Sequence, residues 1–455
     1  MKLSRRGFTR LIAGTGAAAA FGQLARTSAI AAGGSGYRAM VGVFLFGGND
    51  GWNMIVPTDA RYATYATGRG TVALAQSALT PLVDTAFALH PAMAPLRTVW
   101  DEGALGLVLN AGTLYAPLTK SLYQSRSDLR PSNLLSHSDE QAHWQGLRAR
   151  APNYDGFMGR LTDRSIDAQT PSLISLGGSQ LAVIGQRSSP LILPSQGALT
   201  RSGFSAGGNP KNAAIDAFAD GAGLGAITDV TAKHMTAAYA QASTANTILS
   251  STSSVDAYFV NATTGATLNS DIARQLLRVA RMIEARDSLG HARQTFFASQ
   301  GGYDNHSNQV NVGATAAGTH ANLLGDLAQA LTAFYRAMKA LGMAENVTAF
   351  TMSDFGRTFR GNAQYGSDHA WGSNHLVIGG ALKARGVHGA YPNVTLGGPD
   401  DVASEGRFLP GVAQEEYLGA IARWHGVAES DLPYVFPNWA TWTSNGRAPL
   451  GMFKV

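Results

Sequence analysis

The sequence predicts an α/β fold, in which helices cover both faces of a mainly parallel central sheet. Short apolar runs end in glycine or polar residues, and segments with helical spacing lie between them. Continuous apolar runs are typical of strands that are buried on both faces, as they are in parallel sheets. Because strand and helix patterns alternate over most of the length, the helices are expected to connect parallel strands.

The expected strands are short and carry no charge. The clearest are residues 39–46, 105–109 and 347–352, and shorter ones are 173–176, 181–184, 295–298 and 376–378. In the expected helices, apolar residues recur at three- and four-residue spacing. These are residues 91–102, 139–149, 270–285 and 319–341. Ser270 stands where an N-cap is expected.

Residues 202–269 differ from the rest of the chain. They are rich in Ala, Ser, Thr and Gly and contain few large apolar side chains. We expect a helical insertion there, either a cap over the sheet edge or a surface excursion without a function.

The N-terminal residues have the features of a twin-arginine signal peptide. Arg5 and Arg6 are adjacent, Phe8 follows closely, and a weakly hydrophobic run covers residues 11–24. The small-x-small sequence Ala-Ile-Ala at 29–31 is typical of a cleavage site. The alternative is an ordinary amphipathic helix that contains two arginines.

This order of features predicts a signal peptide at residues 1–31 and one domain at 32–455. The twin-arginine translocase is then the expected partner during export, and the mature protein is expected to be periplasmic or extracellular. No later apolar run reaches the roughly 18–20 residues that span a bilayer, so no integral membrane segment is expected in the mature chain.

Charge and cysteine content exclude several classes of function. The chain has 35 Lys and Arg, of which five precede residue 32, so 35 − 5 = 30 basic residues remain against 30 Asp and Glu. A mature domain without excess positive charge is not expected to bind nucleic acid. Cysteine is absent, which leaves Asp, Glu and His as metal ligands and suits folding in a reducing cytoplasm.

Polar residues follow several of the expected strands, where ligands of α/β proteins collect. Asp50 comes after the first strand, in a Gly-Gly-Asn-Asp-Gly sequence, as a hard oxygen donor or as part of a simple turn. Ser136 precedes a helical segment and is the candidate nucleophile, whereas Ser138 is expected to cap that helix.

Two later loops carry further candidates. Asp304 and His306 lie in a glycine-flanked loop after a strand, where carboxylate and imidazole can face one cation. Asp354 ends the 347–352 strand, and Arg357 could hold an oxyanion or form a surface salt bridge. His369 ends the sequence Gly-Ser-Asp-His. His320 is expected to be solvated, and His375 is expected to be packed or to act as a cap.

The order Asp, Ser, Asp with His, Asp, His resembles that of the alkaline phosphatase and sulfatase superfamily. The chain more closely resembles the exported bacterial family called domain of unknown function 1501. Besides the leader, the resemblance rests on residues 47–51, 89–91, 136–137, 304–306, 353–358 and 367–369. It implies an alkaline-phosphatase-like three-layer α/β/α fold. It places metal ligands at Asp50, Asp304, His306, Asp354 and His369, with Ser136 near the nucleophile position.

The chain departs from this pattern at several positions. Phosphatases of the superfamily have a histidine directly after the fourth ligand, where this chain has Phe355, which argues against a second metal ion. Asp354 stands where relatives often have Glu, and Ser138 where they often have an aromatic residue. Cysteine-derived formylglycine, the nucleophile of many sulfatases, is excluded.

Two functions from different classes follow. The first is an exported, metal-dependent hydrolase of a phosphate, sulfate or related ester, with a small molecule or a glycan ester as substrate. Its cofactor would be one or two divalent ions, with zinc, calcium and magnesium all open, and Ser136 and Arg357 would be catalytic. The second is a non-catalytic exported binding or assembly protein of the cell envelope that retains the hydrolase fold.

Overall fold

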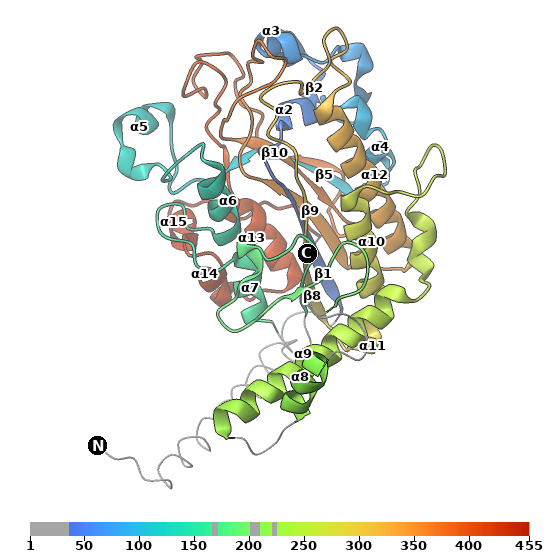
Figure 1. Cartoon of the computed structure of the whole chain (residues 1–455). Coiled ribbons are helices and arrows are strands. Elements are labelled where there is room, and N and C mark those ends of the chain that lie inside the picture. Colours follow the sequence, from blue (N-terminus) through green and yellow to red (C-terminus); the bar gives the residue numbers. More distant parts are fainter. Residues whose placement is uncertain (1–35, 166–171, 201–209, 221–224, 455) are drawn as a thin grey trace, which may run out of the picture.

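The computed structural model describes residues 36–165, 172–200, 210–220 and 225–454 (Figure 1). Within these ranges, nine strands form the main sheet, in the order β11-β5-β10-β9-β1-β8-β6-β7, with β12 beside β5. The strands are β1 (Arg38–Leu45), β5 (Leu105–Gly112), β6 (Leu173–Ser175), β7 (Leu191–Ile192), β8 (Arg293–Gln300), β9 (Val347–Ser353), β10 (Ser373–Ile378), β11 (Gly386–His388) and β12 (Val412–Ala413). Among them, only β10 runs antiparallel to its neighbours.

Strand β1 lies at the centre of this sheet, although it is the first strand of the described chain. It pairs in parallel with β8 on one side and β9 on the other, so that Ala39 lies opposite both Gln294 and Val347. Its side chains alternate between the two faces, and both faces are buried. This double burial explains why the strand is a continuous apolar run.

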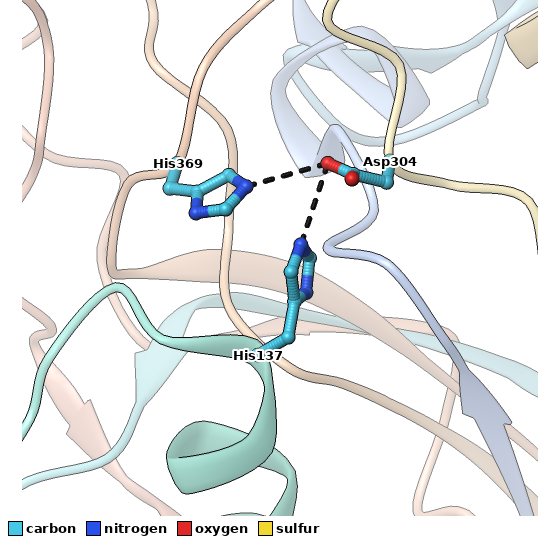
Figure 2. Close-up of side chains that lie close together, drawn as sticks. All are labelled: His137, Asp304 and His369. Carbon is cyan, nitrogen blue, oxygen red and sulfur yellow. Dashed lines mark hydrogen bonds and ion pairs between the residues drawn. The ribbon is translucent and has the colours of Figure 1, made fainter.

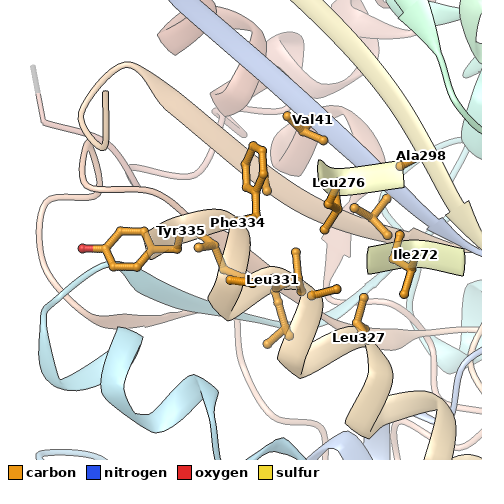
Figure 3. Close-up of a cluster of buried hydrophobic side chains, with 14 of the residues drawn as sticks. Val41, Ile272, Leu276, Ala298, Leu327, Leu331, Phe334 and Tyr335 are labelled. Atoms are coloured by element: carbon orange, nitrogen blue, oxygen red, sulfur yellow. The ribbon is translucent and has the colours of Figure 1, made fainter. Parts of the chain in front are cut away.

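Helices cover both faces of the sheet (Figure 1). One layer contains α4 (Leu96–Asp101), α10 (Asp271–Glu284) and α12 (Thr319–Ala340), and the other contains α6 (His137–Gly146), α7 (Phe157–Asp163), α13 (Gln414–His425) and α14 (Leu432–Val435). Val41 of β1 and Ala298 of β8 pack against Leu276, Leu331 and their neighbours on α10 and α12 (Figure 3). The predicted three-layer α/β/α architecture is therefore confirmed.

The remaining elements belong neither to the main sheet nor to these two helical layers. A smaller sheet contains β2 (Ile55–Pro57), β4 (Phe87–Leu89) and β3 (Thr80–Pro81), in that order. The other helices are α2 (Gly51–Met54), α3 (Arg61–Arg69), α5 (Lys120–Ser125), α11 (Arg286–Leu289) and α15 (Trp439–Ser444). Short 3-10 helices are η1 (Gly70–Val72), η2 (Gln76–Ala78), η3 (Pro91–Met93), η4 (Ser127–Leu129), η5 (Leu181–Val183), η6 (Ser254–Tyr258) and η7 (Glu429–Asp431).

One expected strand is wrong. Of residues 181–184, Leu181–Val183 form the 3-10 helix η5, which packs against α6 and α7 rather than joining the sheet. Its backbone is satisfied there, because the Ala182 N–H donates to Gln145 Oε1 over 3.0 Å and the Ile184 carbonyl accepts from Gly156 N over 2.8 Å. The other expected strands are confirmed, and Ser270 is the N-cap of α10.

The helical insertion is confirmed by α8 (Pro210–Asp220) and α9 (Ala226–Ser250), which project from the body of the molecule in Figure 1. The residues predicted as a signal peptide, 1–31, lie outside the described part of the chain. In that described part, none of the helices combines the length and apolarity that a membrane span requires.

Helix α13 contains a buried carboxyl group that should make stability depend on pH. Glu415 is 2% exposed, and burial raises its pKa from 4.5 to about 7. The folded state therefore binds a proton that the unfolded chain releases near pH 4.5, so the stabilisation is complete below that pH and disappears as pH rises through 7. The loss amounts to about 3 kcal/mol. Between pH 5 and pH 8, the free energy of unfolding in urea should decrease less for Glu415→Gln than for the wild type. An equal decrease in both proteins would contradict this role of the Glu415 carboxyl group.

Candidate metal centre

The carboxyl ends of β8, β1 and β9 meet at one edge of the sheet, where ligands of α/β folds bind. The loops that follow these strands lie against one another there. The Gly47 N–H donates to both carboxylate oxygens of Asp354, at 3.2 Å each. A Cβ on Gly47, whose φ is +111°, would lie 2.5 Å from the backbone N of Asp304, so this close approach requires glycine.

Three imidazoles surround one carboxylate oxygen at this edge. Asp304 Oδ1 lies 3.4 Å from His137 Nε2, 3.0 Å from His306 Nε2 and 3.3 Å from His369 Nε2. Figure 2 shows His137, at the start of α6, and His369 both pointing at Asp304. The donor atoms of these three residues all lie within 4.8 Å of one another. His306 joins them through Asp304 and through His369, whose Nε2 lies 3.0 Å from its own.

The other ring nitrogen of each histidine also has a partner. Nδ1 of His137 lies 2.6 Å from Asp354 Oδ2, and Nδ1 of His306 lies 2.7 Å from Asp368 Oδ1. Nδ1 of His369 lies 2.8 Å from the Leu135 carbonyl oxygen. All three rings are thus held from behind by an acceptor, with Nε2 directed at Asp304.

The surroundings lower the pKa of Asp304 and His369 but raise that of His137. Burial raises the pKa of Asp304, but the hydrogen bond from Arg357 and the nearby positive charge outweigh it and lower the pKa to about 2. Asp304 is therefore ionised at neutral pH. The hydrogen bond to Asp354 raises the pKa of His137, whereas burial lowers that of His369 and favours its neutral form.

Arg357 connects the loops of the site. Its side chain is 1% exposed and contacts Asp304 Oδ1, as well as the carbonyl oxygens of Gly48, Ser367 and Tyr303 at 2.9, 3.0 and 3.1 Å. The Arg357 guanidinium was a candidate from the sequence for binding an oxyanion. It is instead buried and hydrogen-bonded to acceptors of the protein itself. Its main effect here is to hold Asp304 in place.

The structure does not bring all the predicted ligands together. Asp354 is fully buried and faces the back of His137, while it also accepts from Gln141 Nε2 at 2.9 Å. Asp50 is 2% exposed and lies in a different network, where it contacts Arg69 and accepts from Gln309 Nε2 at 2.6 Å. It also caps the short helix α2.

Two residues near the start of α6 complete the site. Ser136 is the N-cap residue of α6 and makes no side-chain cap bond, because its hydroxyl donates to Asp139 Oδ2 over 2.6 Å. His137 was not among the ligands predicted from the sequence, because only the packing of α6 brings it opposite Asp304. Its position next to Ser136 was the available signal.

The fold and this centre define an α/β protein with a cluster of imidazoles and carboxylates at the carboxyl edge of its sheet. The chain belongs to the family described as protein of unknown function (DUF1501), whose model matches residues 37–405. The predicted family membership is therefore confirmed. No curated protein matches the sequence.

Solved structures show only distant similarity. Ps i-CgsB in complex with k-i-k-neocarrahexaose has a TM-score of 0.35 and 10% identity, over 91% of this chain and 78% of that chain. A protein described under the metabolism of multiple glycosaminoglycans by Bacteroides thetaiotaomicron has a TM-score of 0.34 and 11% identity, over 88% of this chain and 80% of that chain. TM-scores this low support no inference about activity.

Proposed function

We propose that this protein is an exported, metal-dependent hydrolase of a phosphate, sulfate or related ester, as its resemblance to the alkaline phosphatase and sulfatase superfamily implies. The observation that supports the proposal is the convergence of His137, Asp304 and His369, from three separate segments, on one point at the carboxyl edge of the sheet. Imidazole and carboxylate side chains whose ligand atoms converge in this way are typical of a divalent cation site.

The surroundings of these residues fit a cation. His137 Nε2 is buried and has no hydrogen-bond partner among the residues that the structure describes. A buried polar atom without a partner is costly, and a bound ion would satisfy it. When bound, a divalent cation would act as a Lewis acid that polarises the ester.

Ser136 is the proposed nucleophile. Its hydroxyl donates to the carboxylate of Asp139, and this hydrogen bond lowers the pKa of Asp139, which therefore stays ionised and orients the hydroxyl. The Ser136 side chain makes no cap bond to α6, so it does not occupy the N–H groups of the first turn. Such groups stabilise negative charge that develops on a substrate oxygen.

A non-catalytic exported binding or assembly protein is the second candidate. Phe355 favours it, because its ring packs against His137 and His369 with centroid distances of 4.8 and 4.6 Å. This ring occupies the position of a further ligand in the two-metal phosphatases, so the centre is proposed to hold one cation only.

Export by the twin-arginine route and a periplasmic or extracellular location are part of the proposal. Arg5, Arg6 and the apolar run that follows support them. Export after folding also fits a chain without cysteine.

The test is turnover of a panel of phosphate and sulfate esters by the purified protein, with Zn²⁺, Ca²⁺ or Mg²⁺ added in turn. His369→Ala is expected to lower turnover by at least about 100-fold, because the cation contributes several kcal/mol to the transition state. His234→Ala removes an exposed imidazole from α9 and should leave turnover unchanged. No hydrolysis with any of the ions would reject the hydrolase. Hydrolysis that His369→Ala leaves intact would reject this centre as its active site.

A further inference from the structure

The hydrogen bonds at Nδ1 determine which nitrogen of each histidine is free. A carbonyl oxygen can only accept, so Nδ1 of His369, 2.8 Å from the Leu135 carbonyl, carries the hydrogen. The buried carboxylate of Asp354 acts in the same way on His137, and the half-exposed carboxylate of Asp368 acts in the same way on His306. In the neutral form of each ring, Nε2 then keeps its lone pair and can bind a metal.

These lone pairs converge in a way that requires a positive charge between them. His306 Nε2 and His369 Nε2 are 3.0 Å apart, and both lie within 3.3 Å of Asp304 Oδ1. Two lone pairs and a carboxylate at these separations repel one another unless a proton or a cation lies among them.

The distances from Asp304 Oδ1 to the imidazole nitrogens match those between the ligand atoms of a small tetrahedral ion. Metal–ligand bonds of about 2.0–2.1 Å place the ligand atoms of a tetrahedral zinc site about 3.3 Å apart. Asp304 Oδ1 lies 3.0 to 3.4 Å from the three imidazole nitrogens. Magnesium and calcium prefer six or more oxygen ligands, whereas imidazole nitrogen favours zinc and related transition metals.

We infer that the centre binds one zinc-class transition-metal ion through His137, His306, His369 and Asp304, and that Asp354 and Asp368 orient two of these imidazoles. The inference rests on the proposed function for the presence of a cation, and it adds the fourth donor, the class of metal and the role of the two carboxylates. Asp354 is thereby a positioning residue and not a ligand.

The backbone before α6 supports this arrangement. Leu135 has a φ of +71°, a left-handed conformation that a bulky side chain rarely adopts. This conformation accompanies the contact between its carbonyl oxygen and Nδ1 of His369. Asp354 is held equally firmly, by Gln141 Nε2 and by the backbone of Gly47. Acceptors that fix the orientation of metal-bound histidines are a regular feature of zinc sites.

The test is metal binding by the purified full chain, measured without reference to turnover. Elemental analysis and titration of the metal-free protein are expected to give one equivalent of Zn²⁺. Ca²⁺ and Mg²⁺ in large excess should not displace it, because these ions prefer oxygen ligands. Substitution with Co²⁺ should give the intense visible absorption of a four-coordinate site.

Variants then separate ligands from orienting residues. Asp354→Asn and Asp368→Asn are expected to weaken Zn²⁺ binding by about 10–100-fold while the stoichiometry stays at one. Asp128→Asn, which removes an exposed carboxylate paired with Arg126, is the matched control and should bind as the wild type does. The Asp368 side chain is 49% exposed, so Asp368→Asn keeps the test available if Asp354→Asn does not fold.

The outcomes also separate this inference from the proposed function. Stoichiometric Zn²⁺ without turnover of any ester would support the inference and reject the hydrolase. Turnover that depends on Ca²⁺ or Mg²⁺, with no tight Zn²⁺ binding, would overturn the inference and leave the hydrolase standing. Affinity that neither Asp354→Asn nor Asp368→Asn changes would reject the positioning role, and absence of any bound ion would overturn the inference.

Discussion

Replacing Asp304 with alanine is expected to remove the bound cation and all measurable ester turnover. Asp304 Oδ1 is the point on which His137, His306 and His369 converge, and Asp304 supplies the negative charge of the centre. Its loss should weaken metal binding by more than the roughly 10–100-fold that is typical of a residue that only orients a ligand. A chelator competition assay measures this loss directly.

The same substitution also has a structural cost, because Arg357 is buried and loses its carboxylate partner. The backbone carbonyls around the guanidinium remain, so the metal-free protein should lose about 1–3 kcal/mol. Urea denaturation of metal-free samples separates this cost from the loss of metal. Asp128→Ala, at an exposed ion pair, is the control for both measurements. Unchanged metal affinity in Asp304→Ala would place the cation elsewhere.

Replacing Asp50 with asparagine is expected to have the largest effect on stability. The side chains of Asp50 and Arg69 are 1% and 0% exposed, so the substitution leaves a buried guanidinium without its counter-charge. Breaking a buried ion pair in this way costs about 3–5 kcal/mol. The free energy of unfolding in urea measures the loss, and Asp59→Asn at the exposed pair with Arg61 should cost no more than about 1 kcal/mol.

Metal loading provides a second comparison for Asp50. If its role is the ion pair with Arg69, Asp50→Asn should cost the same in metal-free and metal-loaded protein. A cost that appears mainly in the loaded protein would instead make Asp50 a ligand, as the resemblance to the phosphatase superfamily implies.

Most of the fold could be predicted because its determinants are local. The runs that form β1, β5 and β9 are mainly apolar, since both faces of these strands are buried. Two features could not be predicted in this way. The antiparallel direction of β10 depends on the path of the chain between β9 and β10. Leu181–Val183 form a 3-10 helix that packs against α6 and α7, which a single segment does not reveal.

The candidate site was only partly visible in the sequence. Asp304, His306 and His369 were predicted together, and the structure brings them together. His137 was missed because its approach depends on how α6 docks. Asp50 is of a residue type that binds metals, but in the structure it pairs with Arg69. This contact forms only after α3 has packed, and no sequence pattern shows it.

The central position of β1 has a consequence for biosynthesis. This strand is translated before every other strand of the sheet, yet the strands on both of its sides end at residues 300 and 353. Its pairing on both sides can therefore be complete only after 353 of the 455 residues have been made. Contacts so distant in sequence slow folding and leave hydrophobic surface exposed to aggregation. A chaperone that covers residues 38–45 during translation would protect the nascent chain until β9 leaves the ribosome.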